Sequence, residues 1–223
     1  MPAASHKKRT TSPRPPSRPR SRQGISGASR FKPDAFWQSE TREHQTVADR
    51  TFKTLKPAFF DLVDICAGSI SSGGKILFFG NGGSAADAQH LATELAVRYV
   101  KNRAPIAALA LTTDTSALTA IGNDMGFDDL FARQIEALGT PGDVAIGIST
   151  SGQSPNVLKA LKMAHKKGLI TAGFTGGHTP NKMIPLCDVA LAVPSKTTAR
   201  IQEMHITLGQ MLCGALEKKL GLV

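Results

Sequence analysis

Five short apolar segments, separated by stretches of helical periodicity, limit the fold of this chain more than any other feature of its sequence. They cover residues 75–79, 106–111, 143–148, 169–174 and 188–193. Strands that are apolar on both faces are typical of a parallel sheet covered by helices on both sides. We therefore expect an α/β fold with a doubly wound, parallel, five-stranded sheet in a flavodoxin-like sandwich.

Helical patterns also flank the five segments. Before them, residues 36–72 carry apolar side chains at spacings of three or four, and Gly73 and Gly74 follow. After them, residues 197–220 form a last helical pattern. A chain of 223 residues is long enough for one well-buried domain. The sequence thus predicts a single domain with N-terminal helices and a C-terminal helix added to the sheet.

The positive charge of the chain is concentrated at its N-terminus. The net charge is +10, and residues 1–30 hold eight Lys or Arg and no acidic residue, which leaves only +2 for the remainder. We expect residues 1–32 to be a disordered basic tail rich in Pro, Ser and Arg, and residues 33–223 to be the folded domain. A nearly neutral domain is not expected to bind nucleic acid, although the charge of the tail is compatible with weak contact to phosphate backbones.

Cysteine content and hydropathy indicate the compartment. Cys66, Cys187 and Cys213 are widely spaced and odd in number, so the sequence suggests neither a disulfide framework nor a cysteine-based zinc site. No segment reaches the roughly 18 apolar residues of a membrane span, and the N-terminus lacks the apolar core of a secretory signal. We expect a cytoplasmic protein; import into an organelle is the second hypothesis, because the tail is rich in Arg and Ser.

The first ligand-type loop is "GNGGS", residues 80–84, which follows the first apolar segment and precedes a helical pattern. Ligands of open parallel sheets bind beyond the carboxyl ends of the strands. The glycines allow positive φ and close approach of backbone amides to a ligand, and Ser84 is expected to cap the helix. The loop has neither the GxGxxG spacing of a dinucleotide site nor the lysine of a P-loop, so no nucleotide cofactor is expected. The alternative is an ordinary glycine-rich turn.

The second ligand-type loop is "STSGQS", residues 149–154, which follows the third apolar segment and precedes Pro155. Four hydroxyls, a glycine and free amides at the start of a helix form a cradle for an anion, and the positive end of the helix dipole adds to it. Capping alone would need fewer hydroxyls. The loop therefore predicts binding of a small phosphorylated molecule.

The helical pattern after the first loop carries an acid-base pair. His90 and Glu94 are one turn apart in "AADAQHLATELAVRY", and Arg98 follows by the same step. A His and a Glu on one face can ligate a divalent metal, or the Glu can act as a general base. The alternative is a solvated face with an ion pair between Glu94 and Arg98. The position beside the first loop favours a functional site.

Five motifs, in order along the chain, carry a resemblance to a known family: "GNGGSAADAQH", "HLATELAVRY", "IGNDMGF", "GDVAIGISTSGQS" and "ARIQEMH". Together they resemble the phosphoheptose isomerases (sedoheptulose-7-phosphate isomerases) of the SIS sugar-phosphate-binding superfamily. The resemblance runs from about residue 41 to residue 220. It implies an SIS-type sheet, a homotetramer with active sites between subunits, phosphate held by the Ser/Thr loop, and a role in bacterial heptose and lipopolysaccharide synthesis.

The resemblance also implies the roles of individual residues. The substrate-binding residues it implies are Asn81, Gly82, Gly83, Ser84, Glu94, Asn123, Asp124, Ser149, Thr150, Ser151, Ser154 and Gln202. The zinc ligands it implies are His90, Glu94 and Gln202, and Gln210 is the candidate at the position of the family's fourth ligand. The expected catalytic residues are Glu94, Gln202 and Gln210.

Gln210 marks the point where the chain departs from the family pattern. The family has a functional His eight residues after the Gln that matches Gln202, and that position is Gln210 here. His205, in the stretch "QEMHITLGQ", follows Gln202 by three residues and is not that His. The departure removes the expected second acid-base group and fourth metal ligand, and the neutral amide oxygen that remains is a weak ligand for zinc.

The expected reaction is the isomerisation of sedoheptulose 7-phosphate to a heptose 7-phosphate through an enediol, with Glu94 as the principal acid-base residue. The alternative is a non-catalytic SIS adaptor resembling the protein that binds the bacterial replication initiator. The missing His favours the adaptor. Glu94 opposes it, because the adaptor lacks a carboxylate at the matching position.

Overall fold

The computed structural model of the protein describes residues 31–223, so most of the predicted tail lies outside the described residues. Five parallel strands form one sheet in the order β2-β1-β3-β4-β5. Their bounds are β1 (Ile76–Gly80), β2 (Ala108–Ala110), β3 (Val144–Ser149), β4 (Ile170–Gly176) and β5 (Val189–Val193). Each predicted apolar segment is a strand, and the order is that of a flavodoxin-like doubly wound sheet, as predicted.

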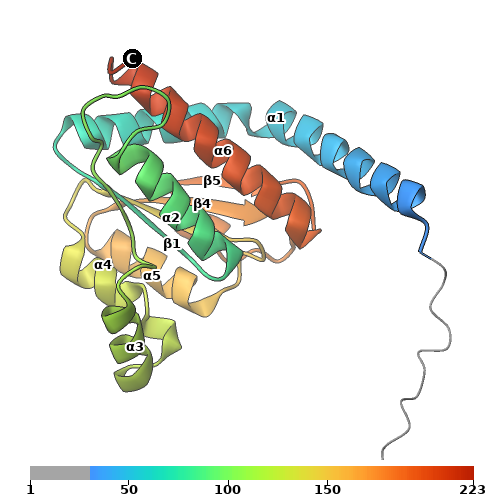
Figure 1. Ribbon diagram of the computed structural model, residues 1–223. Helices are drawn as coiled ribbons and strands as arrows, with labels where there is room; N and C mark the ends of the chain where they lie inside the picture. The colour runs from blue at the N-terminus through green and yellow to red at the C-terminus, as the bar shows by residue number, and fades with distance from the viewer. Residues whose placement is uncertain (1–30) are drawn as a thin grey trace, which may run out of the picture.

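Helices cover both faces of the sheet. They are α1 (Pro33–Ser71), α2 (Gly83–Ala96), α3 (Thr115–Asp124), α4 (Ala132–Leu138), α5 (Pro155–Lys166) and α6 (Thr198–Lys219), with short 3₁₀ turns η1 (Phe127–Asp129) and η2 (Ile184–Leu186). Figure 1 shows α1, α2 and α6 on one face, and α3, α4 and α5 on the other. The molecule is thus a three-layer sandwich.

The two faces of the sheet bury two separate apolar clusters. In β1, Ile76 and Phe78 point into the cluster beneath α1, α2 and α6, whereas Leu77 and Phe79 point into the cluster beneath α4 and α5. All four side chains are fully buried. Because successive side chains of a strand face opposite sides, a strand covered on both faces must be apolar at every position. This is why the strands were recognisable as continuous apolar runs.

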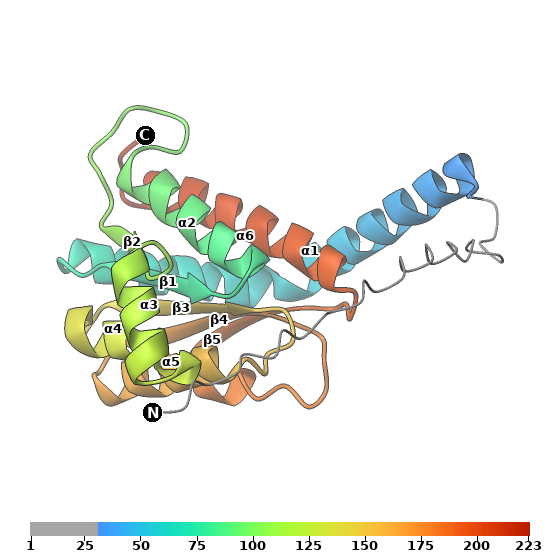
Figure 2. The ribbon, with the colours of Figure 1, turned by 60° about the horizontal axis from the view of Figure 1, so that its bottom comes forward.

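The N-terminal helical region is one long helix rather than several. Helix α1 begins with Pro33 at its first turn and continues through Pro57 to Ser71. Its first buried residue is Val47. Figures 1 and 2 show the N-terminal, blue part of α1 extending beyond the body of the sandwich. Only the second half of α1 therefore contributes to the core.

Two observations bear on the compartment. Cys66, Cys187 and Cys213 are free thiols, and Cys66 and Cys213 are buried. Within residues 31–223, no helix combines the length and the apolar character needed to cross a membrane.

Helix α2 is shorter than the sequence pattern suggested. It ends at Ala96, so Arg98 lies outside the helix and the expected continuation of its polar face is wrong. The reason is the guanidinium of Arg103, which donates hydrogen bonds to the carbonyl oxygens of Glu94 (2.9 Å) and Leu95 (2.7 Å). A cation is favourable at the carbonyl end of a helix, where the last carbonyls lack intrahelical partners. A distant residue thus fixes the end of α2.

Arg103 is itself held by a buried ion pair with α6. Its Nε donates to Glu217 Oε1 at 2.8 Å, and both side chains are almost completely buried. The same oxygen accepts the backbone N–H of Tyr99 at 3.1 Å. Glu217 therefore connects α6, the loop after α2 and the end of α2 itself.

We expect Glu217→Gln to lower the free energy of unfolding by about 3 kcal/mol, because it leaves the Arg103 guanidinium buried without a counter-charge. The measurement is urea denaturation followed by circular dichroism. The control is Glu136→Gln, which removes the exposed partner of Arg133 and should cost less than about 1 kcal/mol. Equal losses in the two variants would contradict the structural role of the buried pair.

Candidate active site

Both ligand-type loops lie at the point where the sheet reverses its winding. The first loop follows β1 and leads into α2, and the second follows the neighbouring strand β3 and leads into α5. These two helices pack on opposite faces of the sheet (Figure 1). The point where the winding reverses, at the carboxyl ends of neighbouring strands, is the usual position of a ligand in such a sheet.

Two asparagines join the loops. Asn81 Nδ2 donates to Asn156 Oδ1, and Asn156 Nδ2 donates to Asn81 Oδ1, both at 2.9 Å. Asn156 is fully buried. A buried pair of amides in which each satisfies the other fixes the distance between the two loops.

The second loop has the shape of an anion cradle. Ser154 directly precedes α5, which begins with Pro155 as predicted, and Ser149 Oγ lies 3.0 Å from Ser154 Oγ. Within the described part of the chain, the backbone N–H groups of Ser151 and Ser154 have no hydrogen-bond partner. Hydroxyls and free amides at the positive end of α5 favour an anion.

Gly152 and Asn181 hold the cradle from beneath. Gly152 has a φ of +64°, and a Cβ there would lie 2.1 Å from the Asn181 side chain. The Asn181 amide donates to Thr175 Oγ1 at 3.0 Å and to the Gly176 carbonyl at 3.1 Å. Only glycine allows the loop to lie this close to the end of β4.

The first loop differs in one detail from the prediction. Helix α2 begins at Gly83, and the residue before it is Gly82, with a φ of +55°. Ser84 is buried within the first turn and does not cap the helix, so the capping role expected for it is wrong. A Cβ on Gly83 would lie 2.3 Å from Gln202 Nε2, so glycine is what allows α6 to bring Gln202 against this loop.

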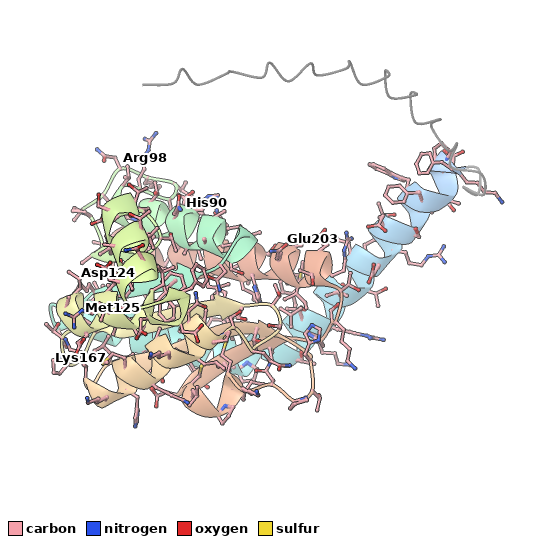
Figure 3. All side chains as sticks on the ribbon, turned by 90° about the horizontal axis from the view of Figure 1, so that it is seen from below. His90, Arg98, Asp124, Met125, Lys167 and Glu203 are labelled. Carbon is pink, nitrogen blue, oxygen red and sulfur yellow. The ribbon has the colours of Figure 1, made fainter. Side chains whose placement is uncertain are left out.

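The acid-base cluster consists of His90, Glu94 and Gln210. His90 Nε2 lies 3.0 Å from Glu94 Oε1 and 2.8 Å from the Gln210 side-chain amide. Figure 3 shows His90 on α2, beside α6. The Glu94 carboxylate, which is about one-fifth exposed, thus pairs with His90, and none of the ion pairs among the described residues joins it to Arg98. Gln210 takes the place beside His90 that the family pattern gives to a second His.

The three groups of this cluster compete for one atom. If His90 Nε2 carries a hydrogen, it donates a hydrogen bond to Glu94; if it does not, it accepts one from the Gln210 amide. One ring nitrogen cannot be donor and acceptor at the same time. A half-turn of the Gln210 amide, which exchanges its nitrogen and oxygen, removes the conflict. An imidazole nitrogen, a carboxylate oxygen and a carbonyl oxygen then face one another, and they can share a proton or a cation.

The donor set fits zinc weakly. Residues 31–223 contain no cluster of three or more His, Cys, Asp or Glu side chains able to hold a metal. The expected ligands comprise one imidazole, one carboxylate and two neutral amides, and an amide oxygen brings no charge to the ion. Gln202 contacts Gly83 at the other end of the α2–α6 contact, two helical turns from Gln210. The donors closest together are those of His90, Glu94 and Gln210.

Asn123 and Asp124 are the expected site residues that the structure does not bring to the loops. They are the last residues of α3, and Asn123 Nδ2 donates to Asp124 Oδ1 at 2.7 Å. Helix α3 lies on the opposite face of the sheet from α2 and α6 (Figure 1), and Figure 3 shows Asp124 well apart from His90. The side-chain hydrogen bond found for these two residues joins them to each other, and none links them to either loop.

His205 belongs to the core. It is completely buried, its Nε2 lies 3.1 Å from the Thr175 carbonyl oxygen, and its ring packs against Phe174. Because the carbonyl only accepts, the proton is on Nε2, and Nδ1 is buried without a partner. Burial lowers the pKa of His205 to about 4, although the hydrogen bond to Thr175 opposes the shift. His205 is neutral at pH 7 and does not replace the missing His.

Two polar residues of this region were missed in the sequence. Asn156 sits in the first turn of α5, where its pairing with Asn81 depends on the fold. Asp87 lies on the same face of α2 as His90 and Glu94, and burial raises its pKa to about 6, with the charge of His90 opposing the shift. Its spacing of three residues before His90 was the available signal.

Comparison with known proteins agrees with this geometry. A model of the SIS domain family matches residues 41–176, which include both loops and the His90–Glu94 pair. The phosphoheptose isomerase of Paramagnetospirillum magneticum is 57% identical over 182 residues, covering 82% of this chain and 94% of that protein. That of Rhodospirillum rubrum is 51% identical over 178 residues, covering 79% of this chain and 94% of that protein.

Solved structures lead to the same family. The structure of a phosphoheptose isomerase from Neisseria gonorrhoeae superposes with a TM-score of 0.79 at 42% identity, covering 84% of this chain and 100% of that one. One from Francisella tularensis gives a TM-score of 0.81 at 32% identity with the same coverage. The fold and the site thus define an SIS-domain sugar-phosphate isomerase. Within that class, the chain belongs to the phosphoheptose isomerase family.

The buried His205 should make stability, not catalysis, depend on pH. Its pKa is lower in the folded protein than in the unfolded chain, so protons favour the unfolded state. Its contribution to stability is present above about pH 6.5 and is lost as the pH falls toward 4, by roughly 3 kcal/mol in total. Urea denaturation of the wild type and His205→Gln between pH 5 and 7 measures this. The two proteins should differ in slope, and parallel slopes would show that His205 is not buried in its neutral form.

Proposed function

We propose that the protein interconverts sedoheptulose 7-phosphate and a heptose 7-phosphate. The observation that carries the proposal is the position of Glu94 and His90 on α2, the helix that leaves the first loop at the same edge of the sheet as the phosphate cradle. The names of the relatives support this choice of sugar. The relatives named above give no support to the adaptor; Gln210 in place of a His is the feature that favours it, and Glu94 remains an argument against it.

Glu94 is the proposed acid-base residue. Interconversion of a ketose and an aldose removes a proton from one of two adjacent carbons, passes through an enediol, and returns a proton to the other carbon. One carboxylate can carry the carbon-bound proton in both directions, while the hydroxyl proton on the C1 oxygen of the ketose is transferred to the C2 oxygen, so the reaction balances without a redox partner. His90, 3.0 Å from Glu94, orients the carboxylate. The amides of Gln202 and Gln210 donate to the oxygens on which negative charge develops.

The phosphate end of the substrate is proposed to lie in the cradle of residues 149–154. The neutral hydroxyls and amides of this loop bind an anion without a strong charge, so phosphate is held without a salt bridge. The Asn81–Asn156 pair fixes the distance from this loop to the loop that precedes α2. Binding at the phosphate thus positions the carbonyl end of the sugar.

Zinc binding is also proposed, at a set of ligands expected to have low affinity for the ion. His90, Glu94 and Gln210, with Gln202, would hold it. A bound zinc ion supplies Lewis-acid stabilisation of a sugar oxygen. The amide at position 210 predicts low affinity, and a Glu94 engaged on zinc is less available as a base.

A homotetramer with sites between subunits is proposed from two features. Apolar side chains remain exposed on α1, on α6 and in the loop after α2, among them Phe52, Phe60, Val100 and Met211. Exposed apolar surface of this kind is typical of an interface. Asn123 and Asp124 lie at the end of α3, outside both loops, and are proposed to contact a substrate held between subunits. Location in the cytoplasm and a role in lipopolysaccharide heptose synthesis are proposals by analogy with the family.

The test of the reaction is incubation with sedoheptulose 7-phosphate in D2O, followed by NMR. The expected product is an aldose phosphate deuterated at C2, because the proton on the carboxylate exchanges with solvent. If no aldose phosphate forms, sedoheptulose 7-phosphate is not the substrate. If shorter ketose phosphates also give no aldose phosphate, the proposed isomerase activity is excluded.

Glu94→Gln should lower the turnover number by about 10²- to 10⁴-fold while the fold is retained, because the amide keeps the shape and loses the base. The measurement is the rate of aldose phosphate formation, with circular dichroism as the check on folding. The matched control is Glu136→Gln, which removes an exposed carboxylate far from the loops and should leave the rate unchanged. A Glu94→Gln enzyme retaining more than about a tenth of the activity would not be consistent with a general base.

Gln210→His should raise zinc affinity, because an imidazole nitrogen replaces an amide oxygen next to His90. The rate should also become dependent on pH between about 6 and 7, where a histidine titrates. Zinc binding by competition with a chromogenic chelator and a pH-rate profile measure the two effects. If both are unaltered, Gln210 takes no part in the site.

A further inference from the structure

A second polar groove lies beside the site, at the carboxyl ends of β4 and β5. It has a volume of about 930 Å³. One wall is the face of α1 from Ser39 to Arg50, and the other is formed by Gly177, after β4, and by residues 194–196, after β5. The edge of the sheet where this groove lies is the one at which parallel sheets bind ligands.

The groove is positively charged. Its walls carry Arg42, Arg50 and Lys196, all exposed, and residues 31–223 provide none of the three with an ion-pair partner. The acidic residue of the walls is Glu43, whose Oε1 accepts a hydrogen bond from Thr197 Oγ1 at 2.7 Å. Three cations against one carboxylate favour an anionic occupant.

A helix terminus adds to this charge. Lys196 is separated by one residue from the start of α6, a helix of 22 residues whose N-terminal residue is Thr198. The Thr197 side chain does not cap the helix, because it donates to Glu43 instead. The positive end of α6 therefore lies beside Lys196, and favours an anion there independently of the arginines.

The distribution of the cations suits a ligand with more than one anionic group. Arg42 and Arg50 are eight residues apart on one helix, which places their Cα atoms about 12 Å apart, and Lys196 lies on the opposite wall. Cations on both walls can bind two phosphate groups of one small molecule. No aromatic side chain lines the groove, so it offers no stacking surface for a nucleobase.

We propose that this groove binds a small ligand with two phosphate groups, such as a sugar bisphosphate, separately from the isomerase site. Ser39, Thr46 and Ser195 also line the groove. The hydroxyls of Ser39 and Thr46 donate to backbone carbonyls of α1 and remain able to accept a hydrogen bond from a sugar hydroxyl. The groove is distinct from the phosphate cradle but adjoins it. Gly177 follows Gly176, whose N–H donates to the Thr150 carbonyl of the cradle at 3.1 Å.

The experiment is isothermal titration calorimetry of the full chain with fructose 1,6-bisphosphate as the probe. Arg42→Gln together with Arg50→Gln should weaken binding by about tenfold or more, the loss expected for charge-assisted contacts to phosphate. Two matched doubles should bind as the wild type does. Lys53→Gln with Lys166→Gln removes the same charge elsewhere, and Ser151→Ala with Ser154→Ala alters only the cradle.

Other results overturn the proposal. If the wild type does not bind the probe, or if the arginine variant binds it equally well, the groove is not a bisphosphate site. If the serine variant loses binding instead, the probe occupies the isomerase site. If the arginine variant changes the mass measured by light scattering, the groove is an interface between copies of this chain. Retention of isomerase activity by the arginine variant shows that it is folded, since neither arginine belongs to the isomerase site.

Discussion

The close approach of α2 and α6 is the constraint on which the isomerase site depends. Two glycines, one on each helix, make it possible. A Cβ on Gly83 would lie 2.3 Å from Gln202, and a Cβ on Gly209 would lie 2.5 Å from Leu91. A larger residue at position 83 would displace the end of the Gln202 side chain, and one at position 209 would have to displace the buried Leu91 side chain. The resulting contact brings the amides of α6 against the first loop at one end and against His90 at the other.

A buried ion pair stabilises the contact between α2 and α6 at the C-terminal end of α2. The Arg103–Glu217 pair joins the last turn of α2 to α6, so the carbonyl groups of Glu94 and Leu95 are fixed by a residue outside the helix. The acid-base carboxylate thus extends from a helical turn whose backbone is held by a buried ion pair. Buried pairs add little stability over apolar packing, but breaking one is costly, so they are effective at enforcing a single arrangement.

The sequence predicted those features that depend on local pattern. The five strands, the two loops and Pro155 at the start of α5 follow from runs of apolar residues and from turn chemistry. Features that depend on contacts made only in the folded chain were not predictable. The end of α2 was misplaced because Arg103, in the loop after the helix, determines it, and Ser84 was misassigned as a cap because Gly82 is the N-cap and the helix begins two residues earlier than a cap at Ser84 implies. The partner of Glu94 proved to be His90, four residues before it, rather than Arg98, four residues after.

Helix α1 combines two regions of very different local stability. From Val47 onward it is anchored by apolar burial, whereas the part before Val47 is attached to the start of α6 through polar contacts such as Glu40–Arg200 and His44–Glu203. Opening of this first part exposes almost no apolar surface, so it can occur without global unfolding. Its amide hydrogens should exchange with solvent far faster than those of the second half. The cationic groove lies at the junction of the two regions, so an occupant that holds α1 against α6 would make the helix behave as one cooperative unit.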